Sequence, residues 1–389
     1  MFNGEKHLDR PLRWAMAGGG RGSQIGYIHR SAALRDNNFK LMAGAFDINP
    51  ERGAAFGQNL GISRERCYPD YQTMFDAEQK REDGIEAVSI ATPNNTHYAI
   101  AKAALLAGMH VVCEKPICFT SAQALELKEI AKQKRKIIGV TYGYTGAQML
   151  HQGRKMIEQG ELGEIRIINM QFAHGFHSTE VEATNPSTKW RVTPEVAGPS
   201  YVLGDVGTHA FYLAEVMIPD LKIKELMCSR QSFVKSRAPL EDNAFVVMHF
   251  AGGAVGTLWA SAVNAGAMHQ LRIRVIGSKA SIEWWDEQPN QLRYEVQGQP
   301  AQILERGMEY LYQDDDAVRS DRIGAGHAEG LFEAWSNIYL RFAAAMERMD
   351  KGRTVDFWYP GIDAGTEGIR LIENCVRSAD NGCQWVEYK

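Results

Sequence analysis

The stretch AGGGRGSQIG (Ala17–Gly26) stands between a short apolar run, RWAMAG, and a run with helical periodicity, SQIGYIHRSAALRD. A glycine-rich turn that leads from a strand into a helix is typical of dinucleotide-binding folds. The glycines allow tight turning, and the first N–H groups of the helix can bind a pyrophosphate. The spacing is irregular: G-x-G-x-x-G read from Gly18 puts Ser23 in third place, and read from Gly20 it puts Ile25 there. The glycines alone are therefore a weak signal.

The residues that follow strengthen this interpretation. A second strand-like run, FKLMAGAFD, ends at Asp47, 21 residues after Gly26. Dinucleotide-binding folds place an acidic residue about 20 residues beyond the glycines, where it binds the adenosine ribose. A carboxylate there would repel the 2′-phosphate of NADP, and no Lys or Arg follows directly in DINP, so the sequence favours NAD over NADP. The alternative is that Asp47 only caps the helix that begins at Pro50. The cofactor contacts expected here are Gly18, Gly20, Gly22, Ser23, Gln24, Ile25 and Asp47.

Strand and helix signals alternate over the first ~145 residues, which is typical of a parallel α/β domain. We therefore predict an α/β domain over residues 1–145. Its expected strands are 13–18, 39–47, 84–93, 110–116 and 136–144, and its expected helices are 23–36, 49–61, 95–108 and 120–136.

From about residue 148 the pattern changes to one helix followed by a series of strand-like runs, several with alternating apolar and polar residues. Strands grouped in this way predict a separate α+β domain with a large, mostly antiparallel sheet over residues 146–389. Its expected helices are 148–163 and 331–349, and its expected strands are 164–174, 223–234, 243–252, 254–263, 270–277, 280–285 and 291–296.

The composition indicates a globular protein, with 389 residues, 44% apolar and 23% charged, and a net charge of −4. A net negative charge of this size does not indicate binding to nucleic acid or to an anionic membrane. No apolar run approaches the roughly 20 residues of a membrane helix, and the N-terminus lacks the apolar core of a signal peptide. The six cysteines form no CxxC pair, so we expect reduced thiols and a cytoplasmic protein.

A second chemical motif lies in HVVCEKPICF, residues 110–119, where an apolar strand is followed by Glu114, Lys115 and Pro116. Ligands of open α/β sheets bind at the carboxyl ends of the strands. A lysine there can polarise a hydroxyl oxygen and stabilise a developing alkoxide. Glu114 is expected to pair with Lys115 or to contact the cofactor; the alternative is a surface lysine after a strand.

A third motif is GDVGTHAFYLAEVM, with Asp205 and His209 four residues apart in a run of helical periodicity. If the helix begins near Asp205, both side chains lie on one face. Histidine is suited to act as a general base near neutral pH, and Asp205 can orient it. The alternative is that Asp205 is a helix cap and His209 a packed residue.

Together these motifs resemble the glucose–fructose oxidoreductase / inositol dehydrogenase / rhizopine catabolism (Gfo/Idh/MocA) family. The resemblance rests on ATPNNTH at 91–97, CEKP at 113–116, QGELGEIRIINMQF at 159–172 and LGDVGTH at 203–209, and it covers most of the chain. It implies an N-terminal Rossmann domain and a C-terminal α/β domain whose open sheet serves for oligomerisation, as a homodimer or homotetramer. It also implies oxidation or reduction of a sugar or cyclitol hydroxyl.

Residue by residue, the resemblance implies catalytic roles for Lys115, Asp205 and His209. It places a cofactor-contacting loop at Thr92, Pro93, Asn94 and His97. Many relatives carry Asn-x-Arg where this chain has Tyr142 and Tyr144, so its substrate contacts depart from the family pattern.

Other candidates lie between residues 174 and 191. His174 and His177 have HxxH spacing, but a zinc site needs a third ligand and the proposed chemistry needs no metal. His177 is instead a candidate for the substrate pocket, as is Tyr142. Trp190 and Arg191 can stack on and hydrogen-bond a polyol, or belong to a loop that packs on its own domain.

The predicted function is NAD-dependent hydride transfer from a secondary hydroxyl of a sugar or cyclitol. Two alternatives remain open: a non-catalytic NAD(P)-binding regulator of the same fold, and an enzyme that retains NADP and serves two sugars in turn. The set Lys115, Asp205 and His209 argues against the regulator, because a sensor needs no general base.

Overall fold

The computed structural model describes residues 4–389, which form two compact units. The N-terminal unit comprises the chain up to Gly143 together with Trp335–Thr366, and the C-terminal unit comprises Tyr144–Ala334 with Glu367–Lys389. Residues 335–366, which the sequence analysis assigned to the second domain, thus group with the first. The reason is local packing, since Phe342 lies against Gly139 of the first sheet, where a Cβ would meet its ring at 2.5 Å.

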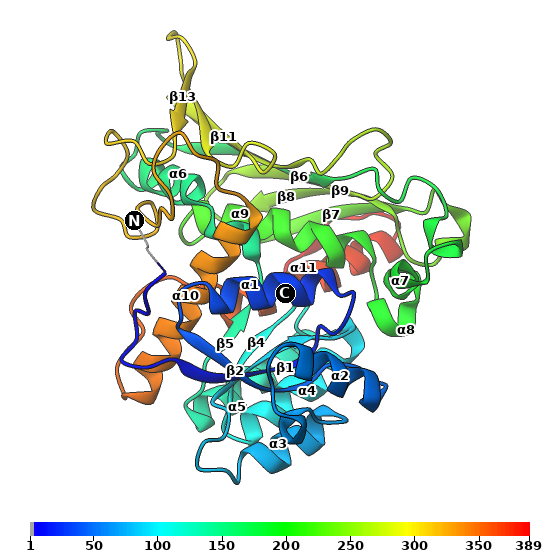
Figure 1. Cartoon of the computed structure of the whole chain (residues 1–389). Coiled ribbons are helices and arrows are strands. Elements are labelled where there is room, and N and C mark those ends of the chain that lie inside the picture. The colour runs from blue at the N-terminus through cyan, green and yellow to red at the C-terminus, as the bar shows by residue number, and fades with distance from the viewer. Residues whose placement is uncertain (1–3) are drawn as a thin grey trace. The chain divides into compact units, whose positions relative to one another are not determined.

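The N-terminal unit contains a five-stranded parallel sheet with strand order β2-β1-β3-β4-β5 (Figure 1). The order reverses beside β1, and open α/β sheets bind ligands outside the carboxyl ends of the strands at such a point. The predicted parallel α/β fold is confirmed. The strands are β1 Leu12–Gly18, β2 Phe39–Ala45, β3 Ala87–Ala91, β4 His110–Cys113 and β5 Ile138–Val140. The helices are α1 Gln24–Leu34, α2 Pro50–Asn59, α3 Tyr71–Glu78, α4 Asn94–Leu106 and α5 Ser121–Lys134.

The helix boundaries of this unit follow from local chemistry. Asn49 caps α2 by accepting a hydrogen bond from the N–H of Arg52, and Pro50 occupies the first helical position. Thr120 and Gln123 form a reciprocal capping box at the start of α5. Gly108 follows the end of α4 with φ of +82°, a conformation that favours glycine.

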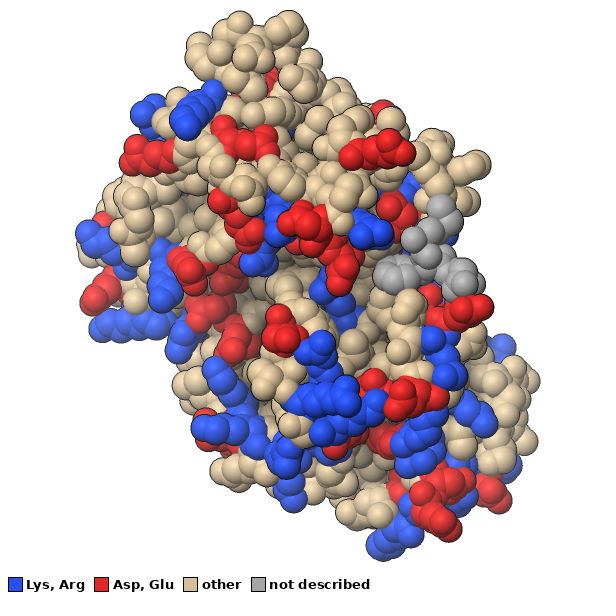
Figure 2. Space-filling model, turned by 90° about the vertical axis from the view of Figure 1, so that its left-hand side faces the viewer, with Lys and Arg blue, Asp and Glu red and all other residues tan. Residues whose placement is uncertain are grey.

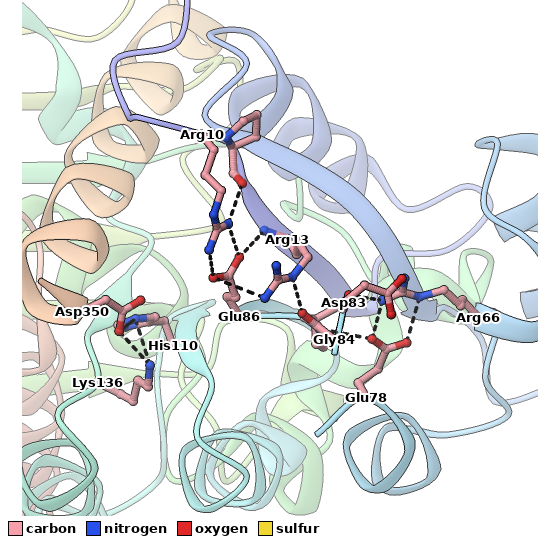
Figure 3. A network of polar contacts seen from close by, with 12 residues as sticks. Arg10, Arg13, Arg66, Glu78, Asp83, Gly84, Glu86, His110, Lys136 and Asp350 are labelled. Atoms are coloured by element: carbon pink, nitrogen blue, oxygen red, sulfur yellow. Dashed lines mark hydrogen bonds and ion pairs between the residues drawn. The ribbon is translucent and has the colours of Figure 1, made fainter. Parts of the chain in front are cut away.

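Ion pairs gather where the parallel strands begin, at the edge of the sheet away from the strands' carboxyl ends. Figure 3 shows three groups: Arg10 and Arg13 with Glu86, Arg66 with Glu78 and Asp83, and His110 and Lys136 with Asp350. Asp350 lies 3.0 Å from Nε2 of His110 and 2.8 Å from Nζ of Lys136. Although burial raises the pKa of Asp350, its hydrogen bonds to His110 and Lys136 outweigh burial and lower the pKa to about 2. These contacts connect α10, Leu331–Asp350, to the strands of the first sheet.

The C-terminal unit is built on a nine-stranded sheet with the order β13-β12-β11-β10-β6-β9-β8-β7-β14 (Figure 1). Among the described residues of this sheet, only β6 and β9 pair in parallel, so the predicted large, mostly antiparallel sheet is confirmed. Helix α9 packs on β6 and β10, and α6 packs on β11 and β12. The strands are β6 Ile165–Ala173, β7 Ile223–Gln231, β8 Asn243–Phe250, β9 Val255–Ser261, β10 Leu271–Gly277, β11 Ala280–Trp285, β12 Gln291–Val296, β13 Gln302–Glu305 and β14 Val386–Glu387. The helices are α6 Gln148–Glu158, α7 Pro186–Lys189, α8 Pro194–Ala197, α9 Thr208–Met217 and the greater part of α11 Ile362–Asp380.

Among residues 4–389, six α-helices and strands were not predicted from the sequence: α3, α7, α8, α11, β13 and β14. Helix α11 contains Gly365 and Gly368, which lower helix propensity, although its apolar residues recur at helical spacing. Strands β13 and β14 have four and two residues and are the edge strands of the sheet, where pairing rather than residue type defines them.

Acidic and basic side chains lie among one another on the face shown in Figure 2. Within residues 4–389, no helix is long and apolar enough to cross a membrane.

Candidate active site

The glycine-rich loop joins β1 to α1 as predicted. Gly18 has φ of +79°, and a Cβ there would meet the carbonyl oxygen of Ala91 at 2.6 Å. In the first turn of α1, a Cβ on Gly26 would meet the carbonyl oxygen of Gly19 at 2.3 Å. Gly26 thus provides the close loop–helix contact that the irregular spacing left unassigned. Ser23 is the N-cap of α1, and its hydroxyl accepts a hydrogen bond from the N–H of Gly26.

The rest of the loop leaves room beside the helix N-terminus. Gly22 has φ of +82°, and a Cβ there would meet nothing within 4 Å. Gln24 and Ile25 form the start of α1, so their N–H groups belong to the helix end that binds anions. Gly20 packs its backbone on Phe46, because a Cβ there would meet the Phe46 carbonyl oxygen at 2.5 Å. The loop therefore has the form of a pyrophosphate cradle, and an NAD molecule fits the residues present.

Asp47 lies just beyond the end of β2. Its carboxylate accepts a hydrogen bond from the N–H of Asn49 at 2.9 Å and pairs with Arg52 at 2.7 Å. The bond from Arg52 lowers the pKa of Asp47. The cap of α2 is Asn49, so Asp47 is not needed for that role. No Lys or Arg follows directly in DINP, but Arg52, five residues after Asp47, places a positive charge beside the carboxylate.

The loop after β3 carries the predicted residues Thr92, Pro93, Asn94 and His97. Pro93 is exposed and precedes α4, while Thr92 accepts a hydrogen bond from the hydroxyl of Thr96 at 2.7 Å. His97 is completely buried, with Nε2 2.8 Å from the carbonyl oxygen of Thr92 and Nδ1 2.7 Å from that of Pro116. The imidazole of His97 thus lies between the loop after β3 and the loop after β4. Because burial lowers the pKa of His97, the ring is neutral and its single N–H donates to one of the two carbonyl oxygens.

Glu114 and Lys115 follow β4 directly. The Glu114 carboxylate lies 3.1 Å from Nε2 of His29 and accepts a hydrogen bond from Thr141 at 2.6 Å. Burial raises the pKa of Glu114, but the bond from His29 and the charge of Lys115 outweigh it and hold the pKa below its ordinary value. Lys115 is half-buried, and its bond to Pro116 is cis. The strand therefore ends in a fixed anion followed by a cation at the ligand-binding edge of the sheet.

In the C-terminal unit, Asp205 and His209 lie at the start of one continuous helix. The chain forms a π-helical turn over Leu203–Gly207 and continues as α9, which begins at Thr208. Such π turns inside helices often occur at functional sites. The carboxylate of Glu241, itself buried, accepts the N–H of Leu203 at 3.2 Å and holds the start of this turn.

Asp205 connects the helix to the predicted substrate residues Trp190 and Arg191. The guanidinium of Arg191 lies 3.3 Å from the Asp205 carboxylate and stacks over the Trp190 ring, 4.4 Å from its centroid. The structure thus brings three residues predicted separately into one contact group. The stacked guanidinium and indole present both an apolar face and hydrogen-bond donors, as polyol recognition requires.

His209 is 7% exposed and lies among aromatic rings. The ring of Tyr144 stands edge-on to it, with centroids 5.0 Å apart, and Phe172 lies 6.2 Å from it. The Tyr144 hydroxyl is 3.1 Å from Nε2 of His269. The neighbouring candidate, Tyr142, belongs to the N-terminal unit and is 2% exposed.

His174 and His177 lie beside this group on the segment after β6. Burial is the main cause that lowers the pKa of His174 to about 4, and burial also lowers the pKa of His177. Nδ1 of His177 forms a short hydrogen bond with the Tyr201 hydroxyl. Both imidazoles are therefore neutral near neutral pH and suited to polar contacts with an uncharged ligand.

A buried arginine holds the segment that carries these histidines. Arg237 is 1% exposed and donates hydrogen bonds to the carbonyl oxygens of His177 and Thr179, at 2.8 and 2.7 Å. Its guanidinium also binds both carboxylate oxygens of Glu182, at 2.7 and 3.0 Å. The hydrogen bonds of Arg237 therefore hold the backbone of this segment in place, although it is not part of a strand.

Several residues of these groups were not predicted from the sequence. They are His29, Tyr144 as a ring against His209, Tyr201, Arg237, Glu241 and His269. Each is defined by contacts between segments distant in the sequence, so no local pattern marks it. Within residues 4–389, no group of three or more His, Cys, Asp or Glu side chains is arranged to hold a metal ion.

Comparison with family models assigns both halves of the chain. Residues 12–142 match the model described as "Oxidoreductase family, NAD-binding Rossmann fold". Residues 154–388 match the model described as "Oxidoreductase family, C-terminal alpha/beta domain".

Individual proteins resemble the chain over its whole length. The "Uncharacterized oxidoreductase YfiI" of Bacillus subtilis (strain 168) is 61% identical over 394 residues, covering 100% of both chains. The crystal structure of an inositol dehydrogenase homolog complexed with NAD+ from Azotobacter vinelandii has a TM-score of 0.98 and 64% identity, covering 100% of both chains. A crystal structure of an inositol dehydrogenase homolog from Azotobacter vinelandii, complexed with NADH and myo-inositol, has a TM-score of 0.94 and 63% identity, covering 99% of this chain and 100% of the other.

Proposed function

Because the chain belongs to the Gfo/Idh/MocA oxidoreductase family, we propose that it is an NAD-dependent dehydrogenase that oxidises a secondary hydroxyl of a cyclitol or a related pyranose. The observation that carries the proposal is a set of three polar side chains. Lys115 follows the end of strand β4, and Asp205 and His209 lie at the start of helix α9. The residues provide the proton acceptor and the cation that removal of a hydride from an alcohol requires.

The roles of the three residues follow from their chemistry. Nε2 or Nδ1 of His209 takes the hydroxyl proton as general base. The ammonium of Lys115 donates a hydrogen bond to the same oxygen and stabilises the alkoxide. Asp205 orients the substrate or the imidazole, and its ion pair with Arg191 keeps the carboxylate in place. NAD bound in the glycine cradle supplies the hydride acceptor.

The cofactor is proposed to be NAD because Asp47 offers a carboxylate to the ribose hydroxyls and repels a 2′-phosphate. The proposed contacts are Gly18, Gly20, Gly22, Ser23, Gln24, Ile25, Asp47, Thr92, Pro93, Asn94 and Glu114 with Lys115. The Azotobacter structure with 64% identity, which contains NAD+, supports this choice.

The substrate class is proposed from the pocket residues and one relative. Neutral His174 and His177, together with Arg191 stacked on Trp190, suit a ligand with many hydroxyls and no charge. The Azotobacter structure with 63% identity contains myo-inositol. We therefore place inositols first among the candidate substrates, before hexoses and anhydrosugars.

The test is NADH formation with a panel of inositols, hexoses and anhydrosugars, for the wild type and for Lys115→Ala and His209→Ala. The expected result is turnover with at least one cyclitol, and losses of about 10²–10⁴-fold in both variants with NAD still bound. Wild-type turnover in both variants would contradict the proposed roles of Lys115 and His209. Binding of NAD without turnover on any compound would favour the regulator.

We also propose that copies of the chain associate through the open face of the nine-stranded sheet. Phe245 of β8 is 51% exposed and stacks on Trp259 of β9, with centroids 5.7 Å apart and planes at 15°. Ile167 and Val255 are 39% and 40% exposed. A patch of this kind on a sheet marks an interface.

A further inference from the structure

A chain of buried hydrogen bonds leads to Glu114 from the interior of the N-terminal unit. Nε1 of Trp14 donates to the Ser89 hydroxyl at 2.9 Å, and Ser89 lies 2.7 Å from the hydroxyl of Tyr339. The Tyr339 hydroxyl is 2.5 Å from Nδ1 of His29, whose Nε2 is 3.1 Å from Glu114. The first four members, Trp14 through His29, are at most 1% exposed, and Glu114 is 9% exposed. The proposed reaction uses none of these four.

The residues at the two ends of this hydrogen-bond series determine which group donates and which accepts at each step. The indole of Trp14 can only donate, and an ionised Glu114 can only accept. His29 therefore carries its proton on Nε2 and accepts at Nδ1 from the Tyr339 hydroxyl. Tyr339 in turn accepts from Ser89, which accepts from Trp14. In this arrangement each hydroxyl donates once. Each of the five side chains then has a hydrogen-bond partner, as a buried network requires.

Lys115 stands between two residues that buried histidines hold. On one side, His29 and Thr141 fix the carboxylate of Glu114. On the other side, Nδ1 of His97 binds the carbonyl oxygen of Pro116. The backbone that carries Lys115 is thus anchored immediately before and immediately after it.

We propose that His29 and Tyr339 are positioning residues for Lys115, which act by holding the Glu114 carboxylate ionised and in place so that Lys115 remains a fixed cation. This inference rests on the proposed function for the catalytic role of Lys115. The effect of His29 and Tyr339 on Lys115, through Glu114, does not depend on that function. An anion next to the ammonium favours its protonated form, which is the form that can donate to a substrate oxygen.

Packing of the Tyr339 ring does not by itself require the hydrogen bonds of its hydroxyl. The Tyr339 ring contacts Trp14, Phe39 and Phe342, with centroids 5.6 to 6.5 Å apart, and a phenylalanine would keep these contacts. The titratable groups that face Glu114 are His29 of α1, His97 of α4, Cys113 of β4, Lys115, and Tyr339 of α10. Of these, only His29 and Lys115 lower the pKa of the carboxyl group.

The test measures Lys115 directly, without substrate. The purified full chain is treated near pH 8 with an amine-selective acylating reagent, and the rate of modification at Lys115 is followed by mass spectrometry. Only the neutral amine reacts, and Glu114→Gln removes the anion that favours the protonated amine, so this variant should increase the rate about tenfold. Tyr339→Phe should increase it about threefold. Tyr359→Phe is the matched control, since Tyr359 also packs on Phe342 but lies outside the chain of hydrogen bonds.

The outcomes separate positioning from structural support. An increased rate in Tyr339→Phe with an unchanged thermal midpoint supports the inference, as does a kcat that falls while KM and the Kd for NAD stay constant. A lowered thermal midpoint with a wild-type modification rate overturns it. If Tyr339→Phe does not fold, Ser89→Ala removes the donor to the same hydroxyl, and a wild-type rate there overturns the inference equally. Modification rates are informative even if no panel compound is oxidised, so the coupling and the proposed function can fail separately.

Discussion

Replacing Arg237 with methionine removes a guanidinium that is almost completely buried while keeping the length of the side chain. The substitution leaves the Glu182 carboxylate and the carbonyl oxygens of His177 and Thr179 without their donors. Breaking a buried ion pair by removing one partner costs roughly 3–5 kcal/mol, because the other charge remains buried. We expect a loss of that order in the free energy of unfolding, measured with urea near neutral pH.

The loss should be concentrated in the segment that carries His177. Amide hydrogen exchange over residues 177–184 should accelerate in Arg237→Met far more than exchange in β10, which does not contact the guanidinium. Because His177 is a proposed substrate residue, KM should rise more than kcat falls. The double variant Arg237→Met/Glu182→Gln should recover part of the loss, since it removes one of the two carboxylate charges that paired with Arg237, while Asp242 remains.

The effect should also depend on pH. Burial raises the pKa of Glu182, but the hydrogen bond from Arg237 outweighs it and lowers the pKa below its ordinary value of 4.5. A carboxyl group with a depressed pKa contributes stability above its unfolded pKa and loses it as the pH falls. The difference between wild type and Arg237→Met should therefore shrink below about pH 4.5. A variant within about 1 kcal/mol of wild type, with unchanged exchange in this segment, would refute the reasoning.

Three further predictions concern other parts of the chain. Asp47→Ser leaves Arg52 free to bind a 2′-phosphate, so kcat/KM with NADP should rise relative to NAD by about tenfold or more; an unchanged ratio would show that Asp47 does not select the cofactor. Asp350→Asn should lower the urea midpoint at neutral pH, and the difference from wild type should vanish between about pH 4 and pH 2, because the folded-state pKa of Asp350 is about 2; a pH-independent difference would contradict this. Phe245→Glu with Trp259→Glu should reduce the mass seen by light scattering to that of a monomer; an oligomer of unchanged size would place the interface elsewhere.

Features with a local cause were predictable from the sequence. The cap at Asn49 and Pro50 and the turn at Gly108 depend on residues within one helical turn. The helices α2 and α4 accordingly lie close to the expected ranges 49–61 and 95–108. The periodicity of β10, with alternate residues buried, likewise depends on a single strand. These signals fixed the order of strands and helices and hence the fold class.

Features that depend on distant contacts were not predictable. Tyr339 lies 310 residues from His29 along the chain, and neither residue stands in a motif. The assignment of residues 335–366 to the N-terminal unit has the same origin, because the burial of α10 against the first sheet is not visible in its periodicity. Arg237 stands in no sequence motif, yet its five N–H donors are matched by acceptors of the segment 177–182 and of Asp242.

The predicted site residues have different surroundings in the structure. Arg191, Trp190 and Asp205 form one contact group, as a common role requires. The ring of His97, expected beside the cofactor, lies between carbonyl oxygens of two loops, those of Thr92 and Pro116. A family motif marks which residues belong to a site, but the hydrogen-bond partners decide what each one does there.

The most direct test of the account is transfer of deuterium in a single turnover. Enzyme with bound NAD is mixed with myo-inositol deuterated at its ring carbons, and the reduced cofactor is analysed by mass spectrometry. The proposed mechanism predicts that one deuterium atom is transferred as deuteride to the nicotinamide in the wild type. Transfer should be at least about 100-fold slower in His209→Ala and Lys115→Ala with NAD still bound. Bound NAD that receives no deuterium from any deuterated inositol, hexose or anhydrosugar would contradict it.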